Sequence, residues 1–166
     1  VPVIALVGGQ NGCFGGMGIV ARCTNHLIMS DVGRLAMSGP EVIEASHGVE
    51  EYDSKDRALV WQTSGGKHRW LTADCDDLVP DTVTAFRAAA VQGLKKPARG
   101  PVTVEELEQE HRMLAHRTAL LPVEQWEHTE NQARHLWQAL GLKHSDQVGQ
   151  MDAAAVKALR SQEALS

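Results

Sequence analysis

The chain has 166 residues, a net charge of −5 and an aromatic content of only 4%. That length suffices for one domain with a buried core, and the lack of a basic stripe disfavours a nucleic-acid-binding protein. The three cysteines are scattered without a CxxC pair, which disfavours both a disulfide framework and a zinc site.

The sequence also bears on where the protein is located in the cell and on whether it binds a metal ion. We see no apolar run of membrane-spanning length and no secretory signal in these residues. The eight histidines are dispersed, so we expect no bound metal ion. We therefore expect a cytoplasmic protein that binds neither a membrane nor nucleic acid. Because Val1 already lies within a predicted strand and is not Met, we also expect the chain to be part of a longer polypeptide.

The first 23 residues are predicted to form a strand, a glycine-rich loop and a helix. The apolar run Val1–Val7 is typical of a buried strand and stops at a pair of glycines. The loop Gly8–Gly16 holds five glycines in nine residues, and the stretch from Met17 to Cys23 suits a helix. Amides at a helix start are unpaired, and the helix dipole favours negative charge there. This loop is therefore suited to bind an oxyanion or a phosphate.

Three interpretations of the loop stay open. The first is a turn whose glycines only let strand and helix pack closely. The second is a dinucleotide site, because Gly16–Ala21 fits G-x-G-x-x-A and Asp31 follows the next apolar run, although a long stretch of loop separates the first strand from the motif. The third is an oxyanion hole made by the backbone amides of Gly15, Gly16 and Met17. A P-loop is disfavoured because no Gly-Lys-Ser/Thr occurs here.

Strands and helices are predicted to alternate after the loop. We expect strands at 26–30 and 34–38, a helix from Pro40 to about Gly48, and a second helix over 56–63. Proline suits the first helical position, and Asp53 or Ser54 is expected to cap the second helix.

Beyond residue 63 we expect a strand at 67–71, a loop at 72–79 and a helix from Pro80 or Asp81 to Gly93. Helices that follow strands give an α/β class in which at least some neighbouring strands are parallel. The glycine loop then lies at the carboxyl end of a strand, which is the edge where ligands bind in such sheets.

The composition changes after a linker at 94–102, which holds Gly, Pro and basic residues. From Thr103 the chain is charged and helical, and Thr103 with Glu106 forms a capping-box pattern. We expect a further helix over 126–140 and a third, alanine-rich one over Asp152–Leu165. Their apolar stripes are typical of an internal core or of a docking surface for a partner subunit.

Four consecutive blocks within residues 1–90 resemble a known family. They are Gly8–Ala21, Gly33–Glu44, Gly48–Gly66 and Thr72–Phe86, in unbroken order. The blocks resemble the β subunit of biotin-independent malonate decarboxylase. More distantly, the Gly-Gly-Met-Gly turn and Gly-Pro-Glu-Val-Ile-Glu resemble the carboxyltransferase subunits of acetyl-CoA carboxylase. The resemblance covers only the latter part of the usual subunit.

The resemblance implies an α/β, crotonase-like spiral of ββα units, present in part, with a C-terminal helical extension. We expect an α/β portion at 1–93, a linker at 94–102 and the extension at 103–166. The resemblance also implies a lyase that works in a complex with a γ subunit and an acyl carrier subunit. Its substrate would be a malonyl thioester on the carrier's CoA-derived arm, and its products acetyl thioester and CO₂. No tightly bound cofactor and no biotin are expected.

The chemistry implied by this resemblance fits the oxyanion-hole interpretation. Loss of CO₂ from a malonyl thioester leaves an enolate, whose negative oxygen would be held by the loop amides named above. A proton must then reach the enolate carbon. The candidate donors are a water and the side chains of Glu41, Glu44 and His47.

Other expectations concern charged residues and rival functions. We expect Arg57 and Arg69 to pair at the surface, and the segment from Asp74 to Asp77 to form a solvated turn. Three other functions stay open: a biotin-dependent carboxyltransferase subunit, a non-catalytic interaction module, and a nucleotide-binding oxidoreductase.

Overall fold

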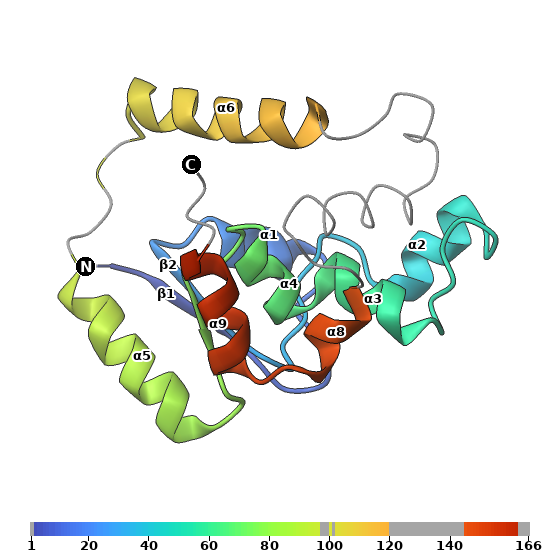
Figure 1. The fold of residues 1–166 in the computed structure, drawn as a ribbon, viewed down its shortest axis with the longest axis horizontal. Helices are drawn as coiled ribbons and strands as arrows, with labels where there is room; N and C mark the ends of the chain where they lie inside the picture. Colours follow the sequence, from blue (N-terminus) through green and yellow to red (C-terminus); the bar gives the residue numbers. More distant parts are fainter. Residues whose placement is uncertain (1, 97–99, 101, 120–144, 163–166) are drawn as a thin grey trace.

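The computed structural model describes residues 2–96, 100, 102–119 and 145–162. Its centre is a parallel sheet of three strands in the order β1-β2-β3 (Figure 1). The strands are β1 (Ile4–Val7), β2 (His26–Ser30) and β3 (Asp77–Val79). All of β2 is buried in the middle of the sheet, whereas one edge of β1 has no partner strand among the described residues.

Helices connect the strands and cover both faces of the sheet. The helix α1 (Gly16–Arg22) joins β1 to β2, and α2 (Pro40–His47), α3 (Arg57–Ser64) and α4 (Gly66–Leu71) lie between β2 and β3. Successive residues of β2 point to opposite faces. Ile28 packs with Ala89 of α5 (Val83–Lys95), whereas Leu27 and Met29 pack with Ala21 of α1. Burial on both faces is typical of a parallel sheet.

Two predictions about strands are wrong. Residues 34–38 form only isolated bridges, from Leu35 to Cys13 and from Arg34 to Gly65. Residues 67–71 belong to α4, which buries His68 and Leu71 on one helix face. A segment this short fits both the helical and the strand period of apolar residues, and the packing of Leu71 against Val156 near the end of the chain favours the helix.

The loop predicted at 72–79 is confirmed for 72–76, but its last three residues form the strand β3. Its three residues are too few to show a period in the sequence. Leu78 and Val79 are both buried, and β3 pairs in register with β2 from Ile28 to Ser30.

The predicted helices over 40–48 and 56–63 are confirmed, with one change of cap. The helix α2 begins at Pro40, as predicted. The cap of α3 is Asp56, whose Oδ1 accepts the N–H groups of Ala58 at 2.9 Å and Leu59 at 3.2 Å. Asp53 and Ser54 lie too early in the chain to reach these amides.

The helix α5 is confirmed, with different ends. Thr82 caps it, because its Oγ1 accepts the N–H of Ala85 at 3.2 Å. The helix continues past Gly93 to Lys95, and Gly93 packs against His26 of β2, where a Cβ would lie 2.9 Å from the imidazole. This glycine therefore serves close packing and not helix termination.

The capping box at Thr103 is confirmed. The Thr103 N–H donates to Oε2 of Glu106 at 3.0 Å, and the Glu106 N–H donates to Oγ1 of Thr103 at 3.2 Å. The helix that follows, α6 (Val104–Ala119), runs along one side of the molecule away from the sheet (Figure 1). Val104 and Leu107 on its first turns are exposed.

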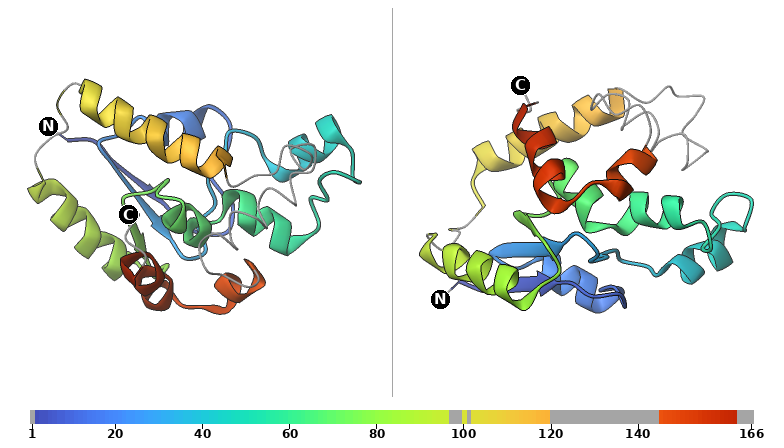
Figure 2. Two further views of the ribbon diagram at one scale, coloured as in Figure 1. Left: turned by 45° about the horizontal axis from the view of Figure 1, so that its top comes forward. Right: turned by 60° about the horizontal axis from the view of Figure 1, so that its bottom comes forward.

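The last two described helices pack onto the α/β layers. They are α8 (Ser145–Gln150) and α9 (Ala153–Gln162), and α9 lies beside α4 (Figures 1 and 2). Val148 and Val156 are fully buried in one cluster with Leu71 and Leu78. The internal-core interpretation of the alanine-rich helix is thus confirmed. The helix predicted over 126–140 lies outside the described residues, and the domain boundaries stay predictions.

Candidate active site

The glycine loop begins where β1 ends and needs several unusual backbone conformations. Gly9, Gly12 and Gly15 have φ angles of 73°, 72° and 66°. Gly15 combines its positive φ with a ψ of −145°, a region open almost only to glycine. The glycines therefore shape the loop, and Gly15 turns the chain directly into α1.

The loop is hydrogen-bonded to the segment 34–37, which follows β2 in the chain. The Cys13 N–H donates to the Arg34 carbonyl at 2.7 Å, and the Cys13 carbonyl accepts from Ala36 at 3.2 Å. The Gly15 N–H donates to the Met37 carbonyl at 2.9 Å. Gly15 was expected to offer its amide to a substrate oxygen, but in this structure that amide is used internally.

The amides of Gly16 and Met17 remain available. Neither has a hydrogen-bond partner among the described residues, and no side chain caps the start of α1. The space around Gly16 is open. Apart from atoms of its own turn, no heavy atom of the described residues lies within 4 Å of a Cβ built on it. Two adjacent N–H groups at a helix start whose first turn holds no acidic residue suit the binding of a negative oxygen.

Apolar side chains are exposed around these amides. Met17 is 64% exposed, Met37 70% and Val20 55%. Buried residues hold the other side of α1, because Ala21 packs against the sheet and a Cβ on Gly18 would lie 2.5 Å from the Ala36 carbonyl oxygen. One side of α1 is thus packed against the rest of the fold, while the exposed apolar side chains lie on its other side.

Glu41 is the candidate proton donor that the fold brings to the loop. Its Oε2 and the ring of Phe14 both lie within 4 Å of the point that a Cβ on Gly39 would occupy. Glu41 is exposed in the first turn of α2, where an acidic side chain also stabilises the helix start.

Glu44 and His47 lie further along α2 and have structural partners. Hydrogen bonds from the side chain and the backbone of Ser54 hold the pKa of Glu44 below its ordinary value. The backbone bond is 2.8 Å long, from the Ser54 N–H to Oε2. His47 is exposed, and its Nδ1 lies 3.2 Å from the Ile43 carbonyl oxygen.

The acidic segment after α4 is not the solvated turn that we expected. Asp74 pairs with Arg69 at 3.3 Å, so Arg69 does form an ion pair, between side chains that are 27% and 23% exposed. Asp76 accepts the N–H of Leu27 at 2.7 Å, and Asp77 pairs with Lys157 of α9. These carboxylates join elements that are distant in the chain, which the sequence pattern did not reveal.

Asp31 and Arg57, the remaining residues singled out in the sequence, are placed as follows. Asp31, the acidic residue of the dinucleotide interpretation, accepts the N–H of Asp81 at 3.1 Å, and Asp81 accepts the N–H of Gly9 at 3.0 Å. Arg57 is exposed at the start of α3. Among the described residues no three His, Cys, Asp or Glu side chains are grouped to hold a metal ion. In the same part of the chain, no helix has the length and hydropathy needed to cross a membrane.

Known proteins resemble this chain over part of their length. No protein-family model matches it. A malonyl-S-ACP:biotin-protein carboxyltransferase, MADC of Malonomonas rubra, is 50% identical over 97 residues, which make up 58% of this chain and 30% of the relative. The chain therefore spans less than a third of that relative.

Two solved structures are similar in fold. One is a Pseudomonas malonate decarboxylase hetero-tetramer in complex with malonate, with a TM-score of 0.63 and 29% identity, covering 81% of this chain and 47% of the other. The second is a Pseudomonas malonate decarboxylase MdcD-MdcE hetero-dimer, with a TM-score of 0.56 and 28% identity, covering 69% and 46%. In sequence and in fold, this chain is similar to part of the subunits of malonate decarboxylase and of a related carboxyltransferase.

Proposed function

We propose that this chain is part of a subunit that removes CO₂ from a malonyl thioester on an acyl carrier protein. One observation carries the proposal: the amides of Gly16 and Met17, which have no partner in the part of the chain that the structure describes, lie at the start of α1. The 50% identity to a malonyl-S-ACP carboxyltransferase supports the choice of substrate. The similarity to malonate decarboxylase structures supports decarboxylation.

The reaction needs stabilisation of negative charge on one oxygen. The bond between the α-carbon and the carboxylate breaks, CO₂ leaves, and the electron pair is shared between the α-carbon and the thioester oxygen. The amides of Gly16 and Met17 bind this enolate oxygen more strongly than the neutral carbonyl of the substrate, so they lower the barrier. In other enzymes the loss of one such donor costs about 3–4 kcal/mol. One proton then adds to the α-carbon and gives the acetyl thioester.

The proton comes from Glu41 or from a water. Glu41 is favoured because its Oε2 and the Phe14 ring of the loop both lie within 4 Å of the position that a Cβ on Gly39 would occupy. Because Glu41 is also an acidic residue in a first helical turn, a water remains the alternative source. We do not assign the proton to Glu44 or His47, because Oε2 of Glu44 accepts the Ser54 N–H and Nδ1 of His47 lies at the Ile43 carbonyl.

We further propose that the chain works as a lyase within a cytoplasmic hetero-oligomer of crotonase-like subunits. A γ subunit completes the site, and an acyl carrier subunit delivers the thioester. The exposed Met17, Val20 and Met37 support a partner surface here, because large apolar side chains gathered around one site mark interaction surfaces.

Carboxyl transfer to biotin is the second candidate function. The observation that raises it is the name of the 50% identical relative, a malonyl-S-ACP:biotin-protein carboxyltransferase. Both functions pass through the same enolate, so the amides of Gly16 and Met17 serve both. They differ in the fate of the carboxyl group, which either leaves as CO₂ or is passed to biotin on a carrier protein.

An assay with carboxyl-labelled malonyl thioester separates these functions. The complex that contains this chain is supplied with the malonyl-loaded carrier in three mixtures: alone, with a biotinylated carrier protein, and with that protein plus avidin. We expect labelled CO₂ at the same rate in all three mixtures. Transfer of label to the biotinylated protein, blocked by avidin, would favour the second candidate. No turnover by a fully assembled complex would leave an interaction module and contradict both.

A further inference from the structure

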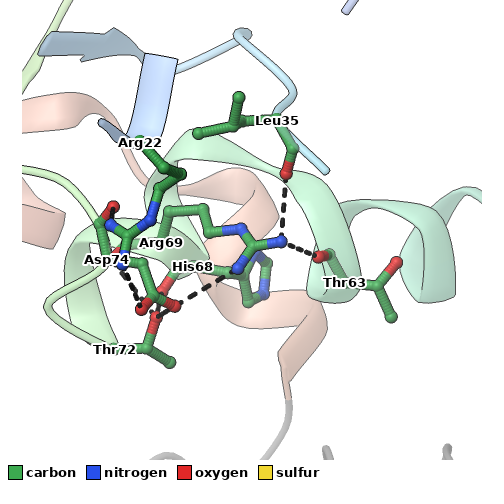
Figure 3. A network of polar contacts seen from close by, with 7 residues as sticks. All are labelled: Arg22, Leu35, Thr63, His68, Arg69, Thr72 and Asp74. Carbon is green, nitrogen blue, oxygen red and sulfur yellow. Dashed lines mark hydrogen bonds and ion pairs between the residues drawn. The ribbon is translucent and has the colours of Figure 1, made fainter. Parts of the chain in front are cut away.

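Arg69 of α4 is the centre of a polar network that reaches three other segments (Figure 3). Its Nη2 donates to the carbonyl of Leu35 at 3.0 Å and to the carbonyl of Thr63 at 2.9 Å. Its Nη1 lies 3.3 Å from Oδ2 of Asp74 and donates to it. One guanidinium group thus joins α4 to the end of α3, to the segment 34–37 and to the loop before β3.

The bond to Leu35 connects this network to the glycine loop. Leu35 lies between the residues whose backbone groups fasten Cys13 and Gly15. The same segment is held from the other side, because the Leu35 N–H donates to the Ser64 carbonyl at 2.8 Å. The segment 34–37 therefore lies between the α3–α4 junction and the glycine loop, and Arg69 donates to the Leu35 carbonyl within it.

Asp74 connects the network to the far end of α1. Arg22, in the last turn of α1, donates from Nη1 to the Asp74 carbonyl, and its Nη2 lies 3.8 Å from Oδ1. Thr72 donates to Oδ2 of the same carboxylate at 2.6 Å. Figure 3 shows the two guanidinium groups on either side of Asp74.

We infer that Arg69 is a positioning residue for the proposed oxyanion site. Through the segment 34–37 it fixes the glycine loop before α1, and through Asp74 and Arg22 it fixes the last turn of α1. The amides of Gly16 and Met17 lie between these two attachments, so their direction is set by the network. The catalytic consequence rests on the proposed function, whereas the structural attachment does not.

The arrangement requires arginine. A guanidinium presents several donors in a planar fork and serves two carbonyls and a carboxylate together, whereas a lysine ammonium is a single point charge on a flexible stem. The Arg69 side chain is only 27% exposed and that of Asp74 23%, so water replaces these bonds poorly. We expect Arg69→Met to release the segment 34–37, and Arg69→Lys to restore part of its attachment.

Hydrogen exchange of the purified chain tests the attachment directly. In Arg69→Met we expect the hydrogen-bonded amides of the segments 13–15 and 34–37 to exchange about tenfold faster or more, because charge-assisted bonds are lost. They are the amides of Cys13, Gly15, Leu35 and Ala36. Amides of α5 should keep their rates. Arg87→Met, which alters an exposed arginine on α5, should leave both regions unchanged. Unchanged exchange in the loop, or equal acceleration throughout the chain, would overturn the inference.

Arg22→Met provides a milder second variant, because the Arg22 side chain is 49% exposed. It removes only the attachment of α1 to Asp74. We expect faster exchange at the end of α1, around Cys23, with unchanged rates in 34–37. No change at the end of α1 would contradict the role assigned to Asp74.

Turnover by the assembled complex tests the catalytic consequence. We expect Arg69→Met to lower kcat roughly 10- to 100-fold with little change in KM, since a small misplacement of binding groups has effects of this size. Arg69→Lys should recover part of kcat. An inactive wild-type complex would contradict the proposed function but leave the exchange result standing. Normal kcat in a variant whose loop exchanges faster would contradict the positioning role alone.

Discussion

Gly15, Gly16 and Gly18 lack side chains for three different reasons. Gly15 has a backbone conformation that other residues adopt only with strain. Gly18 lies against the Ala36 carbonyl, with no room for a Cβ, and Gly16 has open space. The sequence predicted the amide donors of Gly16 and Met17 from the helix start alone. It did not predict that Met37 takes the Gly15 amide, because that bond depends on the tertiary placement of 34–37.

Gly18→Ala is therefore expected to destabilise the fold. The added Cβ would lie 2.5 Å from a backbone oxygen, so the loop or the segment 34–37 must shift. We expect a loss of about 1–3 kcal/mol, the usual cost of forcing extra volume into a packed site. Denaturant unfolding measures it. Gly149→Ala adds the same methyl group in open space and should not destabilise; equal losses for both variants would contradict this assignment.

Tyr52 makes stability depend on pH in the alkaline range. Burial raises its pKa above the ordinary value of 10, and its hydroxyl lies 2.9 Å from Oγ1 of Thr63. The folded chain keeps a phenolic proton that the unfolded chain releases, so stability falls as the pH rises past about 10. We expect Tyr52→Phe to remove this part of the pH dependence and to cost about 1 kcal/mol at neutral pH. Unfolding curves of both proteins between neutral and alkaline pH measure this difference. Parallel curves would contradict the burial of an ionisable hydroxyl.

Among the helices, the starts of α2 and α6 were predicted best, because each carries a clear sequence signal. Pro40 and the Thr103–Glu106 pair gave correct helix starts. The short elements were predicted worst: α4 was taken for a strand and β3 for a loop. Six and three residues are too few to establish a period, and contacts with α9 and β2 decide their structure.

The cap of α3 leads to a prediction about the stability contributed by a single helix. Asp56 accepts two backbone N–H groups of the first turn. We expect Asp56→Ala to lower the free energy of unfolding by about 1 kcal/mol, and Asp56→Asn to keep most of it, because asparagine also caps helices. Thermal unfolding of the two variants distinguishes them. Equal stability of Asp56→Ala and wild type would show that the cap contributes nothing.

At the scale of the whole molecule, the chain's last described helices are part of one core. The composition predicted a helical extension from residue 103, and within it Val156 is fully buried against Leu71 and Leu78. Helical character was visible in the sequence. The partner of the apolar stripe was not, since the contact joins residues about half the chain apart.

We expect Val156→Ala to destabilise the whole chain by about 2 kcal/mol, because two buried methyl groups are lost and a cavity remains. Leu107→Ala on α6 should have little effect, since Leu107 is 56% exposed. Denaturant unfolding followed by a probe on α5 and one on α9 measures both variants. Loss of α9 signal alone in Val156→Ala would indicate a separate unit.

The central claim is that the amides of Gly16 and Met17 hold the enolate oxygen of a malonyl thioester. The most direct measurement is the rate of CO₂ release by the assembled complex with Gly16→Val, beside Gly100→Val, a matched change at a position where no described atom beyond its chain neighbours lies within 4 Å of the added Cβ. With intact assembly and melting temperature, we expect Gly16→Val to lower kcat about 100-fold or more, because the side chain keeps the thioester oxygen from the amides. Gly100→Val should keep the wild-type rate. Equal rates for the two variants would contradict the claim.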